Sequence, residues 1–292
     1  MNIVGDFVRR RNPRLYYGWI ILPVAAISMF FTGPGQTYSF SIFIDSLIEE
    51  FGWTRSLVST LYSTATLLSG LLMFLMGRLI DRFGPKWMSI ASAALLGIAC
   101  ILGSLVINPI MLFAGFFLAR FSGQGTLSLA AGTIAPQWFS KKRALAIMLA
   151  GLGHTIAAMT LPLLNTRLIR LFGWRGAFRY LGFGIWIIYI PIALLFLFNR
   201  PEELSLYPDG EKKDSGKEAG DKPAEAPSFT QTQAMSTAPF WLLAFAIFQF
   251  AMIGTAIGFH YISIMSEQGF SEVFAAKVMS VSPLAGIVSM VT

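Results

Sequence analysis

Long apolar blocks, separated by short charged loops, restrict the fold of this chain more than any other feature of its sequence. The 292 residues are 55% hydrophobic and only 13% charged, with a mean hydropathy of +0.63. A soluble domain carries about 25% charged residues, so this chain has too few to cover a globule. Apolar blocks of such length cross a bilayer as helices. The composition therefore predicts an all-α integral membrane protein.

Seven complete spans and the start of an eighth are expected along the chain. Each span should be a helix, because a strand exposed to lipid leaves backbone groups without hydrogen bonds. The last residues, Ser282 to Thr292, are apolar and carry no polar tail, so we expect the chain to stop inside a helix. The predicted complete spans are 17–43, 56–77, 87–107, 109–138, 144–169, 178–198 and 240–264, and the eighth runs from about 274 to 292.

Basic residues predict the orientation of these spans. The net charge of +7 could indicate nucleic acid in a soluble protein, but here we attribute it to topology, because Lys and Arg gather in cytoplasmic loops. With the N-terminus on the cytoplasmic side of a plasma (inner) membrane, fifteen of the Lys and Arg residues lie inside and five lie outside. Those inside are Arg9, Arg10, Arg11, Arg14, Arg78, Arg82, Lys86, Lys141, Lys142, Arg143, Arg200, Lys212, Lys213, Lys217 and Lys222, and those outside are Arg55, Arg167, Arg170, Arg175 and Arg179.

Residues 199–235 form the one clear linker, rich in Pro, Gly, Ser, Glu and Lys. This composition cannot bury a core, so we expect a mobile cytoplasmic loop. It divides the chain into a six-span unit at 1–198 and a second unit that begins at 236 and continues to 292. An internal echo supports two related halves, because Gly52-Trp53-Thr54-Arg55 and Gly269-Phe270-Ser271-Glu272 precede corresponding spans. Thr54 and Ser271 are predicted helix N-caps.

The most specific motif lies between the second and third spans. There Gly77 would allow a neighbouring helix to approach, Gly84 a tight turn into the third helix, and Asp81 an ion pair with Arg82 or Arg143, or a place at a helix N-terminus. The alternative is an ordinary basic loop. The run resembles, at every defined position, the signature loop of the major facilitator superfamily, Gly-x-Leu-x-Asp-Arg-x-Gly-x-Lys/Arg. Its defined positions are Gly77, Leu79, Asp81, Arg82, Gly84 and Lys86, and Arg78 stands at a variable position of the same predicted gating loop.

Further short matches extend the resemblance over most of the chain. Gly173-Trp174-Arg175 resembles the superfamily's corner before the sixth span, and Lys141-Lys142-Arg143-Ala144-Leu145-Ala146 its basic entry to the fifth. The oxalate/formate and monocarboxylate branch is similar at five runs, which are Tyr17-Gly18-Trp19, Tyr38-Ser39-Phe40-Ser41-Ile42-Phe43, Arg200-Pro201-Glu202-Glu203, Pro208-Asp209-Gly210 and Ala238-Pro239-Phe240-Trp241.

The resemblance implies a secondary transporter with twelve helices. Two six-helix bundles would enclose a central site and expose it to each side in turn. Loop 77–86 would latch the bundles together on the cytoplasmic side. Such a major-facilitator-type bundle would be present here as its N-terminal six-helix half, the seventh helix and part of the eighth. The missing C-terminal bundle is then expected as a partner in the full-length protein.

Arg120 is the main candidate for the substrate site. It lies about eleven residues from the outer end of the fourth span, where an unpaired charge is costly and should face a wet cavity or a partner. Its planar guanidinium can hold a carboxylate at two points. Alternatively, Arg120 fixes neighbouring helices or couples their movement. The superfamily often places an arginine shortly before Gln-Gly, and Gln124 with its flanking glycines fits this pattern with the spacing off by one.

The first span is predicted to be kinked at Gly33-Pro34-Gly35-Gln36-Thr37-Tyr38. Proline removes a backbone donor and the glycines allow bending, so Gln36 and the Tyr38 hydroxyl could face the cavity. By resemblance, Tyr38 aligns with an aromatic residue of the carboxylate site in oxalate transporters. Animal monocarboxylate carriers tend to place a lysine near here, and this chain has none. The alternative is a kink that serves packing alone.

His154, in the fifth span, is a candidate for proton coupling because histidine titrates near neutral pH, although most single bundle histidines are neutral packing residues. No Asp or Glu lies deep in a span, and Cys100 is the only cysteine. The sequence lacks a phosphate-binding loop, a zinc-spaced cluster and a nucleophile elbow, so we expect no catalytic residue, metal, cofactor or enzyme activity.

Together these features predict a secondary transporter of a small organic anion, working in the bilayer by proton symport or anion exchange. The partners expected are a mono- or dicarboxylate, a proton in the case of symport, and lipid, with no nucleic acid. Two alternatives are a drug or sugar exporter of the same superfamily, and a truncated fragment without transport activity.

Overall fold

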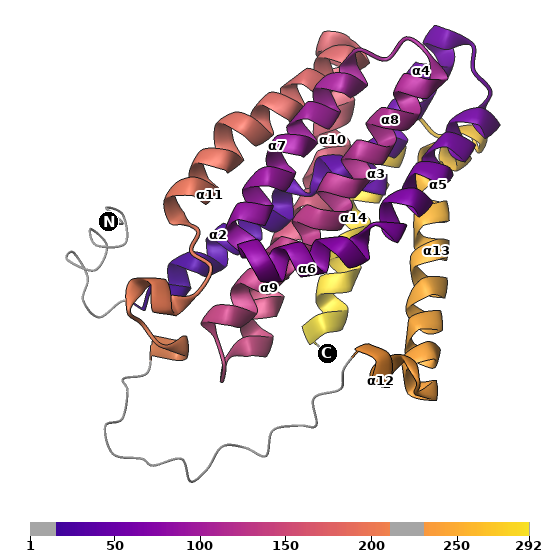
Figure 1. Ribbon diagram of the computed structural model, residues 1–292. Coiled ribbons are helices and arrows are strands. Elements are labelled where there is room, and N and C mark those ends of the chain that lie inside the picture. The colour runs from indigo at the N-terminus through magenta and orange to yellow at the C-terminus, as the bar shows by residue number, and fades with distance from the viewer. Residues whose placement is uncertain (1–15, 211–230, 292) are drawn as a thin grey trace, which may run out of the picture.

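The computed structural model describes residues 16–210 and 231–291, and these residues form helices joined by short turns (Figure 1). Five helices or merged helices are long and apolar enough to cross a membrane, and a bent pair can be counted as a sixth. The expectations for Arg9, Arg10, Arg11, Arg14, Lys212, Lys213, Lys217 and Lys222 fall on residues outside the described ranges.

The first predicted span is a helix broken near its middle. It begins as α2 (Gly18–Phe31), passes through a 3₁₀ turn at Gly33–Gly35, and continues as α3 (Thr37–Phe40) and a second 3₁₀ turn at Ser41–Phe43. The short helix α4 (Ile44–Phe51) follows beyond the predicted end of the span at residue 43. The break lies at the predicted Gly-Pro-Gly run, because proline removes a backbone donor there. Gly52, in the left-handed conformation at φ +64, ends α4.

The next three spans alternate in direction, and the second packs directly against the fourth. The pair α5 (Arg55–Leu71) and α6 (Met73–Phe83) is bent by 45°, and α7 (Pro85–Ser104) returns along it. The fourth span is α8 (Pro109–Ala119), a π-helix at Arg120–Leu127 and α9 (Ser128–Trp138). We call the end of the bundle that holds Gly84 and residues 139–142 the motif end, and the end that holds residues 52–54, 105–108 and Gly173 the far end.

The fifth and sixth spans appear as one element, α10 (Arg143–Gly184), followed by a π-helical turn at Ile185–Tyr189 and α11 (Ile190–Phe196). At 1.5 Å per residue, this 54-residue stretch would be about 80 Å long if straight, far more than one bilayer. The backbone turns at Gly173, whose φ of +69 and ψ of 167 are not helical. Two passes therefore result, as the predicted corner at Gly173-Trp174-Arg175 requires.

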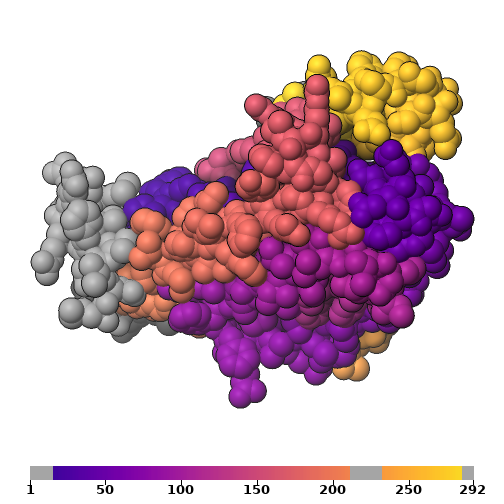
Figure 2. All heavy atoms as spheres, turned by 90° about the horizontal axis from the view of Figure 1, so that it is seen from above, coloured from indigo at the N-terminus to yellow at the C-terminus, as the bar shows by residue number. Residues whose placement is uncertain are grey.

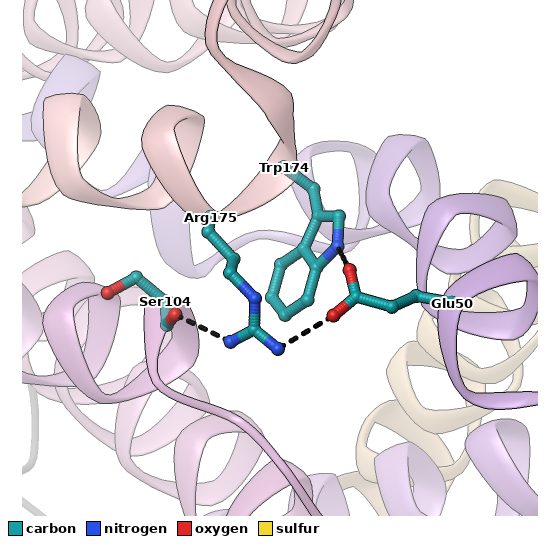
Figure 3. A network of polar contacts seen from close by, with 4 residues as sticks. All are labelled: Glu50, Ser104, Trp174 and Arg175. Carbon is teal, nitrogen blue, oxygen red and sulfur yellow. Dashed lines mark hydrogen bonds and ion pairs between the residues drawn. The ribbon is translucent and has the colours of Figure 1, made fainter.

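A cluster of polar groups fixes this corner at the far end (Figure 3). Arg175 Nη2 lies 2.8 Å from Glu50 Oε1 of α4, and its Nη1 donates to the Ser104 carbonyl at 3.0 Å. The Trp174 indole N–H donates to the other Glu50 oxygen, while the Arg175 guanidinium lies 4.3 Å from the Trp174 ring centre. All of these residues belong to the first six spans, which they hold together.

Close helix crossings depend on small residues, as is usual in membrane bundles. A Cβ added at Gly153 would overlap the Ala26 carbonyl oxygen, and one added at Gly97 would overlap the Trp186 indole nitrogen. Large buried side chains fill the rest of the core, with Trp138, Tyr62, Tyr189 and Phe43 almost fully enclosed.

α12 (Gln231–Met235) lies in the last part of the predicted linker, and the second unit contributes α13 (Ala238–Glu267) and α14 (Glu272–Val291). Only the last turns of α13 are buried, at Phe259, Ile262 and Ser263. Figure 1 shows α13 diverging from the bundle toward its Ala238 end, and Figure 2, seen from above, shows the yellow atoms of α14 at the edge of the molecule. α13 therefore contacts the first six spans at the far end, whereas α14 packs along α10.

The chain after the sixth span packs against the motif end up to residue 210. Pro201 and Leu204 are buried in a 3₁₀ turn at Pro201–Leu204, and Asp209 accepts hydrogen bonds from the backbone N–H groups of Ser140 (2.8 Å) and Lys141 (2.7 Å). The first twelve residues of the predicted linker are thus bound to the bundle surface, whereas residues 211–230 lie outside the described ranges. The linker limits at 199 and 235 stay predictions.

A cavity beside Arg120

A cavity of about 440 Å³ lies between the first six spans and α13. One wall is the middle of α5, another is the π-helix, and the third is α13 between Phe248 and His260. Its lining residues are Tyr62, Ser63, Thr66, Leu67, Arg120, Gln124, Phe248, Ala251, Met252, Thr255, Ala256, Phe259 and His260. The cavity is therefore mainly apolar, with a few polar groups and one permanent charge.

Arg120 supplies that charge, and its side chain is almost buried, at 3% exposed. Nε donates to Thr66 Oγ1 at 3.1 Å and Nη1 to Thr37 Oγ1 at 3.2 Å. The guanidinium carbon lies 5.1 Å from the centre of the Tyr62 ring, and the Tyr62 hydroxyl donates to Thr37 at 2.9 Å. Within residues 16–210 and 231–291, no acidic side chain forms an ion pair with Arg120. Its described partners are all neutral.

The π-helix at Arg120–Leu127 accounts for the unusual spacing of Gln124. A π-helical turn holds about one residue more than an α-helical turn, and such turns are frequent at functional sites. The wide turn is visible in two hydroxyl contacts that reach back five residues, from Thr126 to the Phe121 carbonyl and from Ser128 to the Gly123 carbonyl. The extra residue is absorbed there, so Arg120 and Gln124 both line the cavity.

The broken first helix crosses the π-helix at two glycines. A Cβ added at Gly35 would lie 2.5 Å from the Ala119 carbonyl oxygen and 2.8 Å from Gly123 Cα, so backbone would have to move. The break places Thr37 against Arg120 and directs Gln36 elsewhere. Gln36 is buried, and its amide nitrogen lies 3.4 Å from Thr32 Oγ1 and 3.5 Å from Ser128 Oγ. Gln36 thus joins the first and fourth spans and is not part of the cavity wall.

Tyr38 and His154 lie together, outside the set of residues that lines the cavity. Their ring centres are 6.0 Å apart at 69°, and the Tyr38 hydroxyl is buried without a hydrogen-bond partner among the described residues. Tyr38 also packs against a cluster of Ile262 and Met279 from the second unit. The structure therefore brings Arg120 and Gln124 together at the cavity, and it places Gln36, Tyr38 and His154 around it.

Several residues of the site were not identified from the sequence. Thr37, Thr66 and Tyr62 hold Arg120, while Phe259 and His260 contribute to the opposite wall. A weak signal for two of them was present, since Tyr62 and Thr66 lie four residues apart on one face of their helix, but that span carries several other Ser and Thr residues. No comparable signal marks His260, because the face that it presents is decided by how α13 packs.

The loop motif has a different geometry from the predicted one. α6 continues to Phe83, so Asp81 lies in the last turn of a helix and not at an N-terminus, and it forms no ion pair with Arg82 or Arg143 within the described residues. Arg82 lies 5.3 Å from the Phe83 ring centre, and no described atom approaches a Cβ built on Gly77.

The tight turn expected at Gly84 is present. Its φ of +83 favours glycine, and a Cβ there would overlap Asn199 Oδ1. That Asn199 oxygen accepts the Lys86 backbone N–H at 2.9 Å, and Lys86 Nζ donates to the Leu194 carbonyl at 3.2 Å. The loop is therefore attached to the end of the sixth span. Arg78 has no such described contact.

Comparison with known proteins agrees with this architecture. The family model described as Major Facilitator Superfamily matches residues 25–292. The chain belongs to the major facilitator superfamily. It is thus a multi-pass membrane protein of a transporter family, and not an enzyme, as the sequence predicted.

Individual relatives are distant. The chain is 25% identical to human monocarboxylate transporter 2 over 57% of its own length and 34% of that protein, and 25% identical to the oxalate:formate antiporter of Oxalobacter formigenes over 79% and 51%. It covers 63% of an uncharacterized MFS-type transporter of Escherichia coli, at 24% identity. The chain therefore spans between a third and two thirds of the length of these relatives.

The fold is similar to that of a solved bacterial homologue of the human lysosomal transporter Spinster, in an inward-facing and unoccupied conformation. The TM-score is 0.68 with 16% sequence identity, over 93% of this chain and 60% of that one. This likeness extends the family assignment to the arrangement of the helices, and it concerns the fold alone.

Proposed function

We propose that this chain belongs to a secondary transporter of small organic anions, mono- or dicarboxylates, that works by alternating access. The observation that carries the proposal is Arg120, a nearly buried cation in the wall of a 440 Å³ cavity with no described acidic partner. A charge at this depth costs at least about 2.5–3.5 kcal/mol, and a bound carboxylate would offset that cost.

The chemistry of the cavity fits a small carboxylate better than a large neutral solute. A guanidinium fork binds a carboxylate at two points, and Gln124, whose Oε1 is buried without a described partner, can turn its amide toward the same ligand. Apolar walls from α13 would exclude water and strengthen the attraction. Relatives whose names include monocarboxylate transport and oxalate:formate exchange support the same substrate class.

The proposed site comprises Arg120, Gln124, Gln36 and Tyr38, of which the first two line the cavity and the others support the helix break. His154 is the proposed residue for proton coupling in a symporter, and an exchanger would not need it. The motif end would lie in the cytoplasm, with the loop Gly77–Lys86 as a gating element and the membrane a plasma (inner) membrane. A second six-helix bundle would complete the site.

Two alternative functions make different use of the same residues. The hydroxyls of Thr37 and Thr66 already bind Arg120, which favours a role in fixing helices and would allow a drug or sugar exporter. A fragment without transport activity is the third possibility, because the chain covers only part of its relatives. Each alternative predicts its own response to a change at Arg120.

Counterflow of labelled oxalate in proteoliposomes tests these functions. The 292-residue chain is compared with the Oxalobacter antiporter prepared in the same way, both as wild type and, in this chain, as Arg120→Lys and Arg120→Gln. We expect saturable counterflow that Arg120→Gln abolishes. Arg120→Lys keeps the charge but loses the fork, so kcat/KM should fall roughly tenfold, equivalent to about 1.4 kcal/mol.

The outcomes separate the alternatives. Unchanged kinetics in Arg120→Lys would exclude two-point binding of the anion by Arg120. Transport of a neutral sugar or drug that survives Arg120→Gln would identify an exporter. Activity in the antiporter with none in the 292-residue chain would support the fragment hypothesis.

A further inference from the structure

A polar cluster at the far end joins the first six spans to α13. Arg55, the first residue of α5, donates from Nη2 to Asp45 Oδ1 of α4 at 2.5 Å. From Nη1 the same guanidinium donates to the Ser263 hydroxyl of α13. Asp45 and Arg55 are partly exposed, whereas Ser263 is buried at 5% exposed. One side chain therefore spans the boundary between the two units.

Apolar contacts close the same boundary around this cluster. The Tyr62 ring stacks on Phe259 of α13 with ring centres 4.2 Å apart. Ile262 and Met279 are buried against Tyr38 and Ile42 of the broken first span. Together these contacts, which we call the seal, pack the two units against each other on the far-end side of the cavity.

On the other side of the cavity, the described part of α13 has no comparable contacts with the first six spans. Side chains of α13 near the motif end are exposed, Leu242 at 71% and Phe250 at 83%. Within the described residues, no hydrogen bond or ion pair joins Ala238–Gly258 to the first six spans. Among the described contacts, α13 is therefore attached to the first six spans near the far end only.

We propose that Arg55 and Ser263 form the gate that closes the cavity at the far end, and that separation of this pair opens it to that side. This inference rests on the proposed transport function and adds the conformational step to it. Asp45 lies on the same unit as Arg55, so it keeps the guanidinium oriented and paired when α13 departs. Ser263 is a neutral acceptor, and a hydrogen bond to a hydroxyl is weaker than one to a carboxylate. The contact between Arg55 and Ser263 can therefore break while Arg55 keeps its ion pair with Asp45, so that no charge is left unpaired.

The gate is adjacent to the cavity along α13. His260 lines the cavity and lies three residues before Ser263, so the two side chains are neighbours on one face of the helix. Phe259 also lines the cavity, and it belongs to the seal because its ring stacks on Tyr62. A ligand beside Arg120 would touch the same turn of α13 that carries the gate residue.

Access of a thiol reagent to the cavity tests the gate without any substrate. In a Cys100→Ala background, Thr255→Cys places a reporter in the cavity wall. A membrane-impermeant sulfonated maleimide is then applied to sealed vesicles of each orientation. We expect Ser263→Ala and Arg55→Gln to raise the labelling rate from the far-end side at least tenfold and to lower it from the motif-end side.

Arg175→Gln is the matched control, because it removes an arginine of the same end whose partners all lie within the first six spans. Its labelling should equal that of the parent. Ser263→Ala is the mildest gate variant and leaves the Asp45 ion pair in place, so it remains informative if Arg55→Gln fails to fold. Unchanged labelling in Ser263→Ala, or an equal rise in Arg175→Gln, would overturn the proposal.

The result is independent of the substrate hypothesis. A labelling response without oxalate counterflow would support the gate and reject the proposed anion, while counterflow with no labelling response would reject the gate alone.

Discussion

Two arginine clusters at the far end have nearly the same chemistry and opposite consequences. Arg55 pairs with Asp45 of α4, and Arg175 pairs with Glu50 of the same helix. The second donor group of Arg175 goes to the Ser104 carbonyl within the first six spans (Figure 3). The second donor group of Arg55 goes to the Ser263 hydroxyl, across the boundary to α13. The partner of the second donor group therefore decides whether a cluster holds one unit together or joins two units.

The difference shows how a bundle can be rigid and still move as a unit. The Arg175 cluster uses an ion pair, a backbone carbonyl and the Trp174 indole, none of which changes if α13 moves. The Arg55 cluster keeps its ion pair inside one unit and crosses the boundary with a neutral contact. Rocking of two bundles about a central site needs this division between permanent and reversible contacts.

Converting the reversible contact into a permanent one should have the largest effect. Ser263→Asp would give Arg55 a second carboxylate, and the boundary would then be joined by an ion pair like that of the Arg175 cluster. We expect counterflow to fall more than tenfold and far-end labelling of the cavity to become undetectable. Arg55→Ala in the same chain should restore part of the labelling, because the new carboxylate loses its partner.

The counterpart at Arg175 should change stability and leave access to the cavity unchanged. Glu50→Gln removes the negative charge that binds Arg175 and the Trp174 indole. The side chains of Arg175 and Glu50 are partly exposed, at 32% and 42%. After allowance for solvent screening, we expect a loss of about 1 kcal/mol. A lower thermal midpoint with normal cavity labelling would agree, and altered labelling would contradict the division between the two clusters.

The pH dependence of stability sharpens the same point. Hydrogen bonds from Arg175 and then from Trp174 lower the pKa of Glu50 below its ordinary value of 4.5. A carboxylate with a lowered folded-state pKa stabilises the protein fully above the ordinary pKa, and this contribution is lost as the pH falls through the lowered value.

Thermal midpoints of wild type and Glu50→Gln therefore should differ at pH 7 and converge in acid. A constant difference down to pH 3 would show that the carboxylate charge of Glu50 contributes nothing.

Local features of the fold could be predicted from the sequence because they depend on neighbouring residues. The span lengths follow from apolar runs, and the turn at Gly84 from its position in the motif. Thr54 Oγ1 accepts the Leu57 N–H at 3.2 Å, and Ser271 Oγ accepts the Phe274 N–H at 3.3 Å. Both predicted N-caps are therefore confirmed.

The candidate site could be predicted only in part, because its contacts are long-range. Arg120 was found by its charge and depth, but its partners Thr37 and Thr66 are 83 and 54 residues away. Depth within a span does not show which face a side chain presents, so His154 was chosen and His260 was not. Arg55 was identified only as a basic residue on the outer side and as the last residue of a repeated four-residue run, since its contact with Ser263 exists only in the folded chain.

The smallest expected effect comes from a change that separates the positive charge of Arg55 from the two-point geometry of its guanidinium group. Arg55→Lys retains a cation for Asp45, but the ammonium group is a single point and cannot hold two partners with the fixed geometry of a guanidinium. The contact with Ser263 should weaken while the ion pair persists. We expect far-end labelling of the cavity to rise two- to threefold, well below the effect of Arg55→Gln, with an unchanged thermal midpoint. A labelling rate as high as that of Arg55→Gln would show that the guanidinium contact with Ser263, and not the charge near Asp45, accounts for the whole effect of Arg55 on access to the cavity.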